Sequence, residues 1–179
     1  MGAKGVKLDV GPVEEVSREE WGARLPLVTK PIQFPVAVIT VHFTNTQTCS
    51  TREECIKIVK ELQRRDMDDK NLIDIRYNFL IGGDGAIYEG RGWKAAGIRV
   101  PVIHEMVDLF LESIDVAYIG TVQDADDSEI LRSTFEKLVK LGKLRRYIRM
   151  REFYLWKEGG FLKKKNLPNC DGFDELPYD

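Results

Sequence analysis

The side chains of this sequence best suited to metal binding or thiol chemistry are two histidines, His42 and His104, and three cysteines, Cys49, Cys55 and Cys170. His42 ends an apolar run, where an isolated histidine can ligate a metal or simply be a hydrogen-bonded core residue. Cys49 and Cys55 have five residues between them around a predicted helix start, so a short disulfide can close there in an oxidising compartment. Cys170 is left over, as a free thiol or a small buried side chain.

A predicted strand and a predicted helix position these groups. The β-branched run Val36–Phe43 predicts a buried strand with His42 near its end. Thr51 and Glu54 form a capping box, which predicts a helix start. The apolar stripe of this helix consists of Cys55, Ile58, Val59 and Leu62.

Further elements alternate strands with helices. They are a hairpin of Arg76–Ile81 and Ala86–Glu89 around the turn Gly82–Gly85, a strand Ile114–Val122, and a helix from Asp127 or Ser128 to Gly142. This alternation predicts the α/β class: a single domain with a central mixed β-sheet flanked by helices.

The ends of the chain have weaker patterns. Residues 1–15 lack an apolar period and are expected to form a flexible leader, with the domain covering 16–179. Ser17 and Glu20 have capping-box spacing before Trp21. The tail after Glu158 is expected to be mostly irregular.

Composition and charge exclude several classes of protein. The chain has 179 residues, 43% hydrophobic and 31% charged, which is typical of one globular domain. Its formal net charge of −2 argues against a dedicated nucleic-acid binder. No apolar stretch approaches the roughly 20 residues of a membrane-spanning helix, and the first residues lack the apolar core of a secretory signal.

Four segments carry a resemblance to a known family. They are Val16–Arg24, Asp74–Gly85, Ile87–Trp93 and Ser113–Ile114 with Tyr118–Gly120. In order and spacing they closely resemble the peptidoglycan recognition proteins of innate immunity, which share their fold with phage-type zinc N-acetylmuramoyl-L-alanine amidases. The resemblance extends over about residues 16–142 and implies a groove for muropeptide, with a divergent C-terminal segment from about 143. It also implies a disulfide between Cys49 and Cys55.

Catalytic members of the resembled family hold zinc with two histidines and one cysteine, beside a tyrosine. His42 matches the first ligand and Tyr77 the tyrosine. The second histidine is missing after Tyr147–Met150, where the chain has only Arg151 and Glu152. A catalytic zinc ion is held by three protein ligands, and its fourth coordination position binds the water that the metal activates. The alternative donors are Glu152 as an oxygen ligand, His104 in an insertion, and Cys170, which only faintly matches the family cysteine. We therefore expect a non-catalytic member with no metal and no cofactor.

The expected ligand-binding residues are different ones. Arg91 matches an arginine that pairs with the extra carboxylate of diaminopimelate-type peptides, and a guanidinium can do this bidentately. Against that selectivity, Asn71–Leu72 replaces the glycine and tryptophan usual in such members. Trp93 belongs to the same motif as Arg91, and Arg99 stands near a family histidine that faces the groove. With His42 and Tyr77, these residues make up the predicted ligand-binding set.

An insertion leaves three functions open. About six extra residues, several of them apolar, lie within 98–112 and must be covered by the domain's own groove or by another protein. The chain is then a muropeptide receptor that signals by association, a regulatory or decoy domain with a blocked groove that pairs with another recognition protein, or a zinc amidase with unusual ligands. We favour these three functions in the order in which they are given.

The resemblance also sets the expected partners and location. Partners are bacterial peptidoglycan fragments or another peptidoglycan recognition protein, with dimer formation left open. Nucleic acid and membrane insertion by this segment are not expected. The location is extracellular, as a secreted protein or a receptor ectodomain, while an intracellular location stays open.

Overall fold

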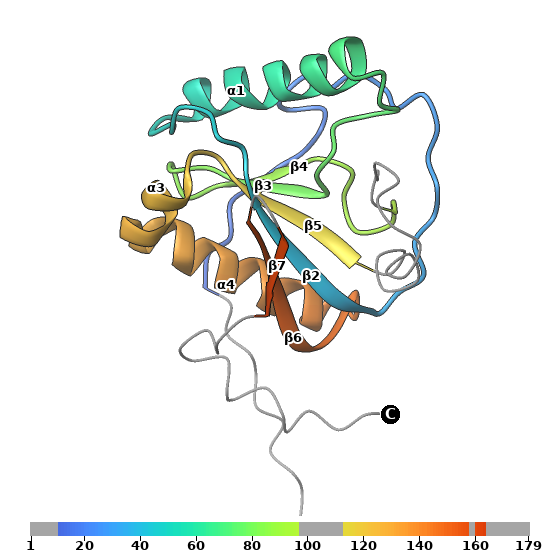
Figure 1. The fold of residues 1–179 in the computed structure, drawn as a ribbon, viewed down its shortest axis with the longest axis vertical. Coiled ribbons are helices and arrows are strands. Elements are labelled where there is room, and N and C mark those ends of the chain that lie inside the picture. The colour runs from blue at the N-terminus through green and yellow to red at the C-terminus, as the bar shows by residue number, and fades with distance from the viewer. Residues whose placement is uncertain (1–10, 97–112, 158–159, 164–179) are drawn as a thin grey trace, which may run out of the picture.

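The computed structural model describes residues 11–96, 113–157 and 160–163, and in these ranges seven strands form one mixed sheet (Figure 1). In spatial order the strands are β1 (Glu15–Val16), β4 (Ile87–Glu89), β3 (Phe79–Ile81), β5 (Ser113–Tyr118), β2 (Val36–Phe43), β6 (Ile148–Lys157) and β7 (Gly160–Lys163). The central strands β3, β5, β2 and β6 run parallel, whereas β4 and β7 pair antiparallel with β3 and β6. The predicted α/β class with a mixed sheet is confirmed.

Helices cover both faces of this sheet. They are α1 (Arg52–Arg64), which continues into the π-helical turn η1 (Arg65–Asp69), α3 (Val122–Asp127) and α4 (Glu129–Leu144). Figure 1 shows α1 on one side of the sheet and α3 with α4 on the other. None of the helices in the described ranges has the length and apolar character that crossing a membrane requires.

Local sequence signals explain where the long helices begin. Thr51 accepts a hydrogen bond from the backbone of Glu54, and the Glu54 side chain accepts one from the backbone of Thr51, so the predicted capping box is confirmed. Ser128 accepts a hydrogen bond from the backbone N–H of Leu131 at the start of α4. Each cap satisfies backbone donors that the first helical turn leaves unpaired.

Strand alternation divides the buried side chains between two cores. In β2, Ile39 and Val41 belong to the cluster that includes Leu131 and Phe135 of α4. The second cluster includes Val59 and Leu62 of α1, together with residues from the other face of the sheet. Since successive strand residues point to opposite faces, Thr40 and His42 lie on the α1 side.

Several sequence predictions are confirmed and others are wrong. The strand Val36–Phe43 is observed with the predicted bounds, and the hairpin forms with shorter strands, β3 and β4. The predicted strand Ile114–Val122 ends at Tyr118, because Gly120 adopts a φ of 136° and Thr121 caps α3. Irregular structure after Glu158 is wrong for Gly160–Lys163, which pairs with β6.

The capping-box pattern near the N-terminus forms a closed turn. Ser17 N–H donates to Glu20 Oε2 at 2.7 Å, and Glu20 N–H donates to Ser17 Oγ at 3.2 Å. Gly22, with a φ of 71°, then turns the chain in a conformation that disfavours other residues. The indole of Trp21 donates to the carbonyl of Glu89 at 2.8 Å, which ties this turn to the end of β4.

A disulfide joins Cys49 to Cys55 at the start of α1. Its loop packs on the turn of the β3–β4 hairpin, where a Cβ atom at Gly82 would come within 2.8 Å of Cys55 Sγ. The bridge implied by the family resemblance is therefore present, and it lies against the hairpin turn.

Cys55→Ser is expected to lower the free energy of unfolding by about 2 kcal/mol, because the bridge closes a short loop in the unfolded chain. Urea denaturation measures this loss. Mass spectrometry after alkylation without reductant is expected to find one free thiol, that of Cys170, which lies outside the described residues. Three free thiols would contradict the bridge.

Candidate functional site

A polar cluster lies among the buried strands and consists of Thr40, His42, Asn78, Arg91 and Asp115. Thr40 and His42 come from β2, and Asp115 comes from the adjacent β5, where it is in register with Thr40. Thr40, Asn78 and Asp115 are buried, while the His42 side chain is 21% exposed. This mixture gives the cluster fixed internal groups and one partly accessible ring.

The carboxylate of Asp115 connects the two basic side chains of this cluster. Its Oδ1 accepts from the Thr40 hydroxyl and lies 3.3 Å from His42 Nε2. Its Oδ2 lies 3.6 Å from Nη2 of Arg91, whose side chain is 4% exposed. Burial alone would raise the pKa of the Asp115 carboxyl, but hydrogen bonds from His42 and Thr40 and the charges of His42 and Arg91 hold it below its ordinary value. Asp115 is therefore ionised at neutral pH.

Asp115→Asn is expected to make the free energy of unfolding less dependent on pH in the acid range. Because the pKa of Asp115 is lower in the folded protein than in the unfolded chain, its ionisation contributes stability that is fully present above the ordinary value of about 4. That stability is lost as the pH falls through the lower folded value. Urea denaturation should show that the free energy of unfolding falls more for the wild type than for Asp115→Asn as the pH is lowered below about 4. Equal losses in the two proteins would contradict this ionisation.

Asn78 fixes the surroundings of Asp115 and Arg91. Its Nδ2 donates to the carbonyls of Gly92 and Ala95, each at 2.8 Å. Its Oδ1 accepts from the backbone N–H of Asp115 at 2.9 Å and from Arg91 Nη2 at 3.3 Å. One buried amide therefore uses its whole hydrogen-bonding capacity to join β5 to the loop that carries Arg91.

The aromatic ring of Tyr77 lies beside His42. The ring centroids are 5.5 Å apart, and Tyr77 is largely buried. This burial raises the pKa of its hydroxyl, so Tyr77 is a neutral hydrogen-bonding group at physiological pH.

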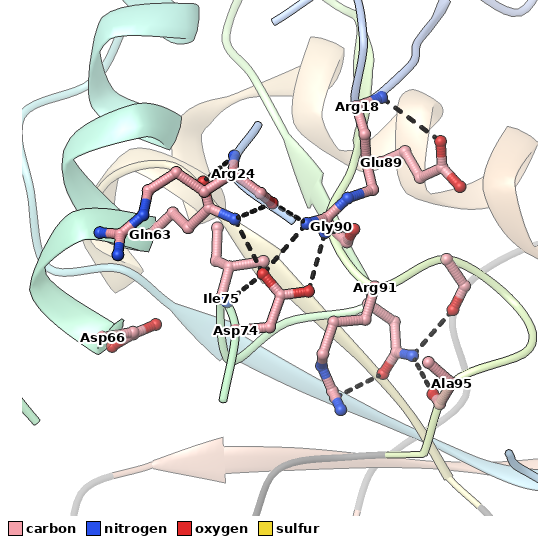
Figure 2. A network of polar contacts seen from close by, with 12 residues as sticks. Arg18, Arg24, Gln63, Asp66, Asp74, Ile75, Glu89, Gly90, Arg91 and Ala95 are labelled. Atoms are coloured by element: carbon pink, nitrogen blue, oxygen red, sulfur yellow. Dashed lines mark hydrogen bonds and ion pairs between the residues drawn. The ribbon is translucent and has the colours of Figure 1, made fainter. Parts of the chain in front are cut away.

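A second network of hydrogen bonds supports the loop that carries Arg91. Figure 2 shows Arg18 and Gln63 converging on Asp74. Arg18 donates to both Asp74 oxygens, at 2.9 and 3.1 Å, and to the carbonyl of Gly90, the residue before Arg91. Gln63 Nε2 donates to Asp74 Oδ1 at 2.8 Å. The buried carboxylate of Asp74 thus joins the N-terminal turn to α1, and Arg18 joins the same turn to the Arg91 loop.

The donor set does not fit a zinc site within the described ranges, which contain no group of three His, Cys, Asp or Glu side chains able to hold a metal. His42 Nε2 contacts Thr40 and Asp115 instead. The alternative donor Glu152 is in register with Val38, which lies four residues before His42 in β2. Because a strand rises about 3.3 Å per residue, the backbone of Glu152 lies far from His42. His104 and Cys170 lie outside the described residues.

The structure places the other predicted ligand-binding residues differently. Arg91 does lie near His42, but its guanidinium is already paired with Asp115. Trp93 lies in the core on the α4 side, where its ring stacks on Tyr147 with centroids 5.4 Å apart. Only 9% of Trp93 is exposed, and its role in ligand binding stays a prediction. Arg99 and the insertion 98–112 fall outside the described residues.

Sequence reasoning missed Asp115, Asn78 and Thr40. A signal for Asp115 was available, because it is a carboxylate within the apolar strand Ser113–Tyr118 and such a group needs partners when buried. No comparable signal marked Asn78, whose importance comes from four contacts made far along the chain.

Comparisons with known proteins agree with this fold and these motifs. Residues 33–157 match the family model for N-acetylmuramoyl-L-alanine amidase. The chain is 37% identical over 134 residues to peptidoglycan-recognition protein LC of Drosophila melanogaster, covering 72% of this chain and 25% of that protein. It thus spans about a quarter of that relative.

Solved structures give the same result. The ectodomain of the Drosophila transmembrane receptor PGRP-LCa superposes with a TM-score of 0.68 at 32% identity, covering 78% of this chain and 84% of that one. A complex of tracheal cytotoxin with the ectodomains of PGRP-LCa and PGRP-LCx superposes with a TM-score of 0.70 at 28% identity, over 80% and 82%. With its motifs in order on this sheet, the chain belongs to the peptidoglycan recognition proteins, within the N-acetylmuramoyl-L-alanine amidase family.

Proposed function

We propose that this domain recognises muropeptide in innate immunity without hydrolysing it. The observation that carries the proposal is the polar cluster, in which the partly exposed ring of His42 lies beside Tyr77 and above the Asp115–Arg91 pair. Muropeptides offer amides, hydroxyls and carboxylates, which such groups can hydrogen-bond. The related complex with tracheal cytotoxin supports the same ligand class.

The non-catalytic part of the proposal is supported by the donor set. His42 is the one position that matches the family's zinc ligands within the described ranges, and its Nε2 contacts Thr40 and Asp115. A two-histidine, one-cysteine site would need both His104, the one other histidine of the sequence, and Cys170, the one cysteine outside the disulfide, to reach His42.

Binding is tested by titration calorimetry with soluble muramyl peptides. His42→Ala is expected to weaken binding about tenfold, because the partly exposed ring is lost. Glu129→Ala, an exposed substitution on α4 across the sheet, is the matched control and should leave the affinity unchanged. Equal affinities of the wild type and His42→Ala would remove the cluster from the binding site.

Hydrolysis is tested separately, with zinc added. The protein is expected to retain no stoichiometric zinc and to release no peptide from peptidoglycan. One tightly held zinc per chain, with amide cleavage that is lost in His42→Ala, would instead establish an amidase.

A second function has one observation in its favour. The guanidinium of Arg91 is buried and already paired, which reduces what the cluster can offer a ligand. A regulatory domain that pairs with another recognition protein would bind no muropeptide and would associate with that protein in analytical ultracentrifugation.

We also propose an extracellular location, as a secreted protein or a receptor ectodomain. The Cys49–Cys55 disulfide supports it, since such bonds persist in oxidising compartments. The similarity to the ectodomain of a transmembrane receptor agrees with this location.

A further inference from the structure

The segment that leads into β2, residues 25–34, concentrates exposed apolar side chains. Six large apolar side chains are strongly exposed in the described ranges, and four of them lie in this segment: Leu25, Leu27, Val28 and Phe34, at 86%, 70%, 54% and 49% exposure. In Figure 1 the segment is the blue trace along the rim of the molecule that ends at β2. We call residues 25–34 the apolar strip, because apolar side chains grouped in this way mark an interaction surface, whereas single ones do not.

Backbone hydrogen bonds hold the apolar strip in place. Near its start, the N–H of Leu27 donates to the carbonyl of Ile73 at 2.8 Å. Further along, the N–H of Ile32, a buried residue, donates to the carbonyl of Lys94 at 3.0 Å. The exposed side chains therefore stand on a fixed backbone, and a partner that binds them does not have to order the chain first.

The charges of the apolar strip are positive. Residues 25–34 contain one charged residue, Lys30, and no acidic residue. Lys94 belongs to the segment that pairs with the strip, and both lysines are exposed, without an ion pair in the described part of the chain. Asp68 is neutralised by Arg24, the residue directly before the strip, at 2.7 Å. The surface therefore combines aliphatic side chains with unpaired positive charge.

This composition fits a lipid bilayer better than it fits a protein partner. Protein interfaces are depleted in lysine, and Leu and Val are under-represented among the side chains that dominate their binding energy. Peripheral membrane binding uses apolar side chains together with lysines that attract anionic headgroups. A second copy of the chain is disfavoured, since a two-fold contact between strips would bring the lysines of both copies together.

We propose that the apolar strip, together with Lys94, is a docking surface for a bilayer of anionic phospholipid. The aliphatic side chains enter the headgroup region, and Lys30 and Lys94 pair with lipid phosphates. Such docking is peripheral, so it needs no membrane-spanning helix and differs from insertion of the chain across a bilayer. It goes beyond the proposed function, because none of these residues belongs to the polar cluster.

The test measures co-sedimentation of the protein with vesicles of phosphatidylcholine, with and without phosphatidylglycerol. The wild type is expected to bind the mixed vesicles at least about tenfold more tightly, because each lysine near an anionic surface contributes about fivefold. Added salt should weaken this binding, since ions screen the lysines. Lys30→Gln and Lys94→Gln are each expected to weaken binding to the mixed vesicles about fivefold.

A second set of variants tests the apolar contribution. Leu25→Asp is expected to weaken binding to the mixed vesicles at least about tenfold, because an apolar contact is lost and a negative charge is added. The matched control is Ile130→Asp, which makes the same change at a half-exposed side chain on α4 and should bind as the wild type does. Leu25→Asp should keep the melting temperature of the wild type, because its side chain is exposed.

The outcomes distinguish this inference from the proposed function. Equal binding to the two kinds of vesicle, or no binding to either, overturns the inference and leaves muropeptide recognition standing. Wild-type affinity in Leu25→Asp, or an equal loss in Ile130→Asp, does the same. A large fall in the melting temperature of Leu25→Asp would show that the protein itself covers this side chain. Self-association that Leu25→Asp abolishes would assign the strip to a second copy, and either result overturns the lipid surface. Vesicle binding without muropeptide binding overturns the proposed function alone.

Discussion

Asp74→Ala is expected to lower the free energy of unfolding by about 3–5 kcal/mol, the loss typical of removing one partner from a buried ion pair. Asp74 is buried and accepts bonds from Arg18, Gln63 and the backbone N–H of Ile75. Its removal leaves the Arg18 guanidinium, 22% exposed, without its carboxylate, and leaves a buried amide donor and a backbone donor unsatisfied.

Urea denaturation followed by circular dichroism measures this loss. The matched control is Asp68→Ala, because Asp68 also pairs with an arginine, Arg24, but both side chains are about half exposed. Exposed pairs contribute about 0–1 kcal/mol, so this control should change stability little. Similar losses in the two variants would show that the Asp74 network does not stabilise the fold as its burial implies.

Asn78→Ala is expected to lower the free energy of unfolding by about 3 kcal/mol or more and to weaken muropeptide binding. The substitution leaves the carbonyls of Gly92 and Ala95 and the backbone N–H of Asp115 without their partner, and unsatisfied buried groups cost about 1–3 kcal/mol each. It also releases the loop that carries Arg91, so the geometry of the polar cluster is lost.

Two measurements separate these effects. Urea denaturation gives the loss of stability, and calorimetry at a temperature where the variant remains folded gives the loss of affinity. Gln47→Ala removes an exposed amide and serves as the control, with little change expected in either quantity. Weaker stability with unchanged affinity would limit Asn78 to a role in folding.

Elements with a local signal could be predicted from the sequence. The strand Val36–Phe43 is a continuous β-branched run, and the start of α1 at Arg52 follows from the capping box of Thr51 and Glu54. The hairpin follows from its glycine turn, in which Gly85 adopts a φ of 84°. In each case, residues close together in the sequence carry the signal, although β2 is completed by pairing with the distant β5 and β6.

Elements and side chains that depend on distant contacts could not be predicted in the same way. The strand β6, Ile148–Lys157, mixes charged and apolar residues and was not predicted, yet it pairs with β2. The role of Asp115 depends on Arg91 and His42, which reach it from other elements. The motif of Trp93 gives no sign that its ring packs against Phe79 and Tyr147 in the core.

The position of β2 in the sheet has a consequence for biosynthesis. On one side β2 pairs with β5, and on the other it pairs with β6, which is among the last described parts of the chain to leave the ribosome. Until Ile148–Lys157 emerges, the apolar strand Val36–Phe43 has one bare edge, and bare edges are templates for pairing with other chains. Truncated products that end before Ile148 should therefore aggregate, because the sheet is complete only once β6 has been synthesised.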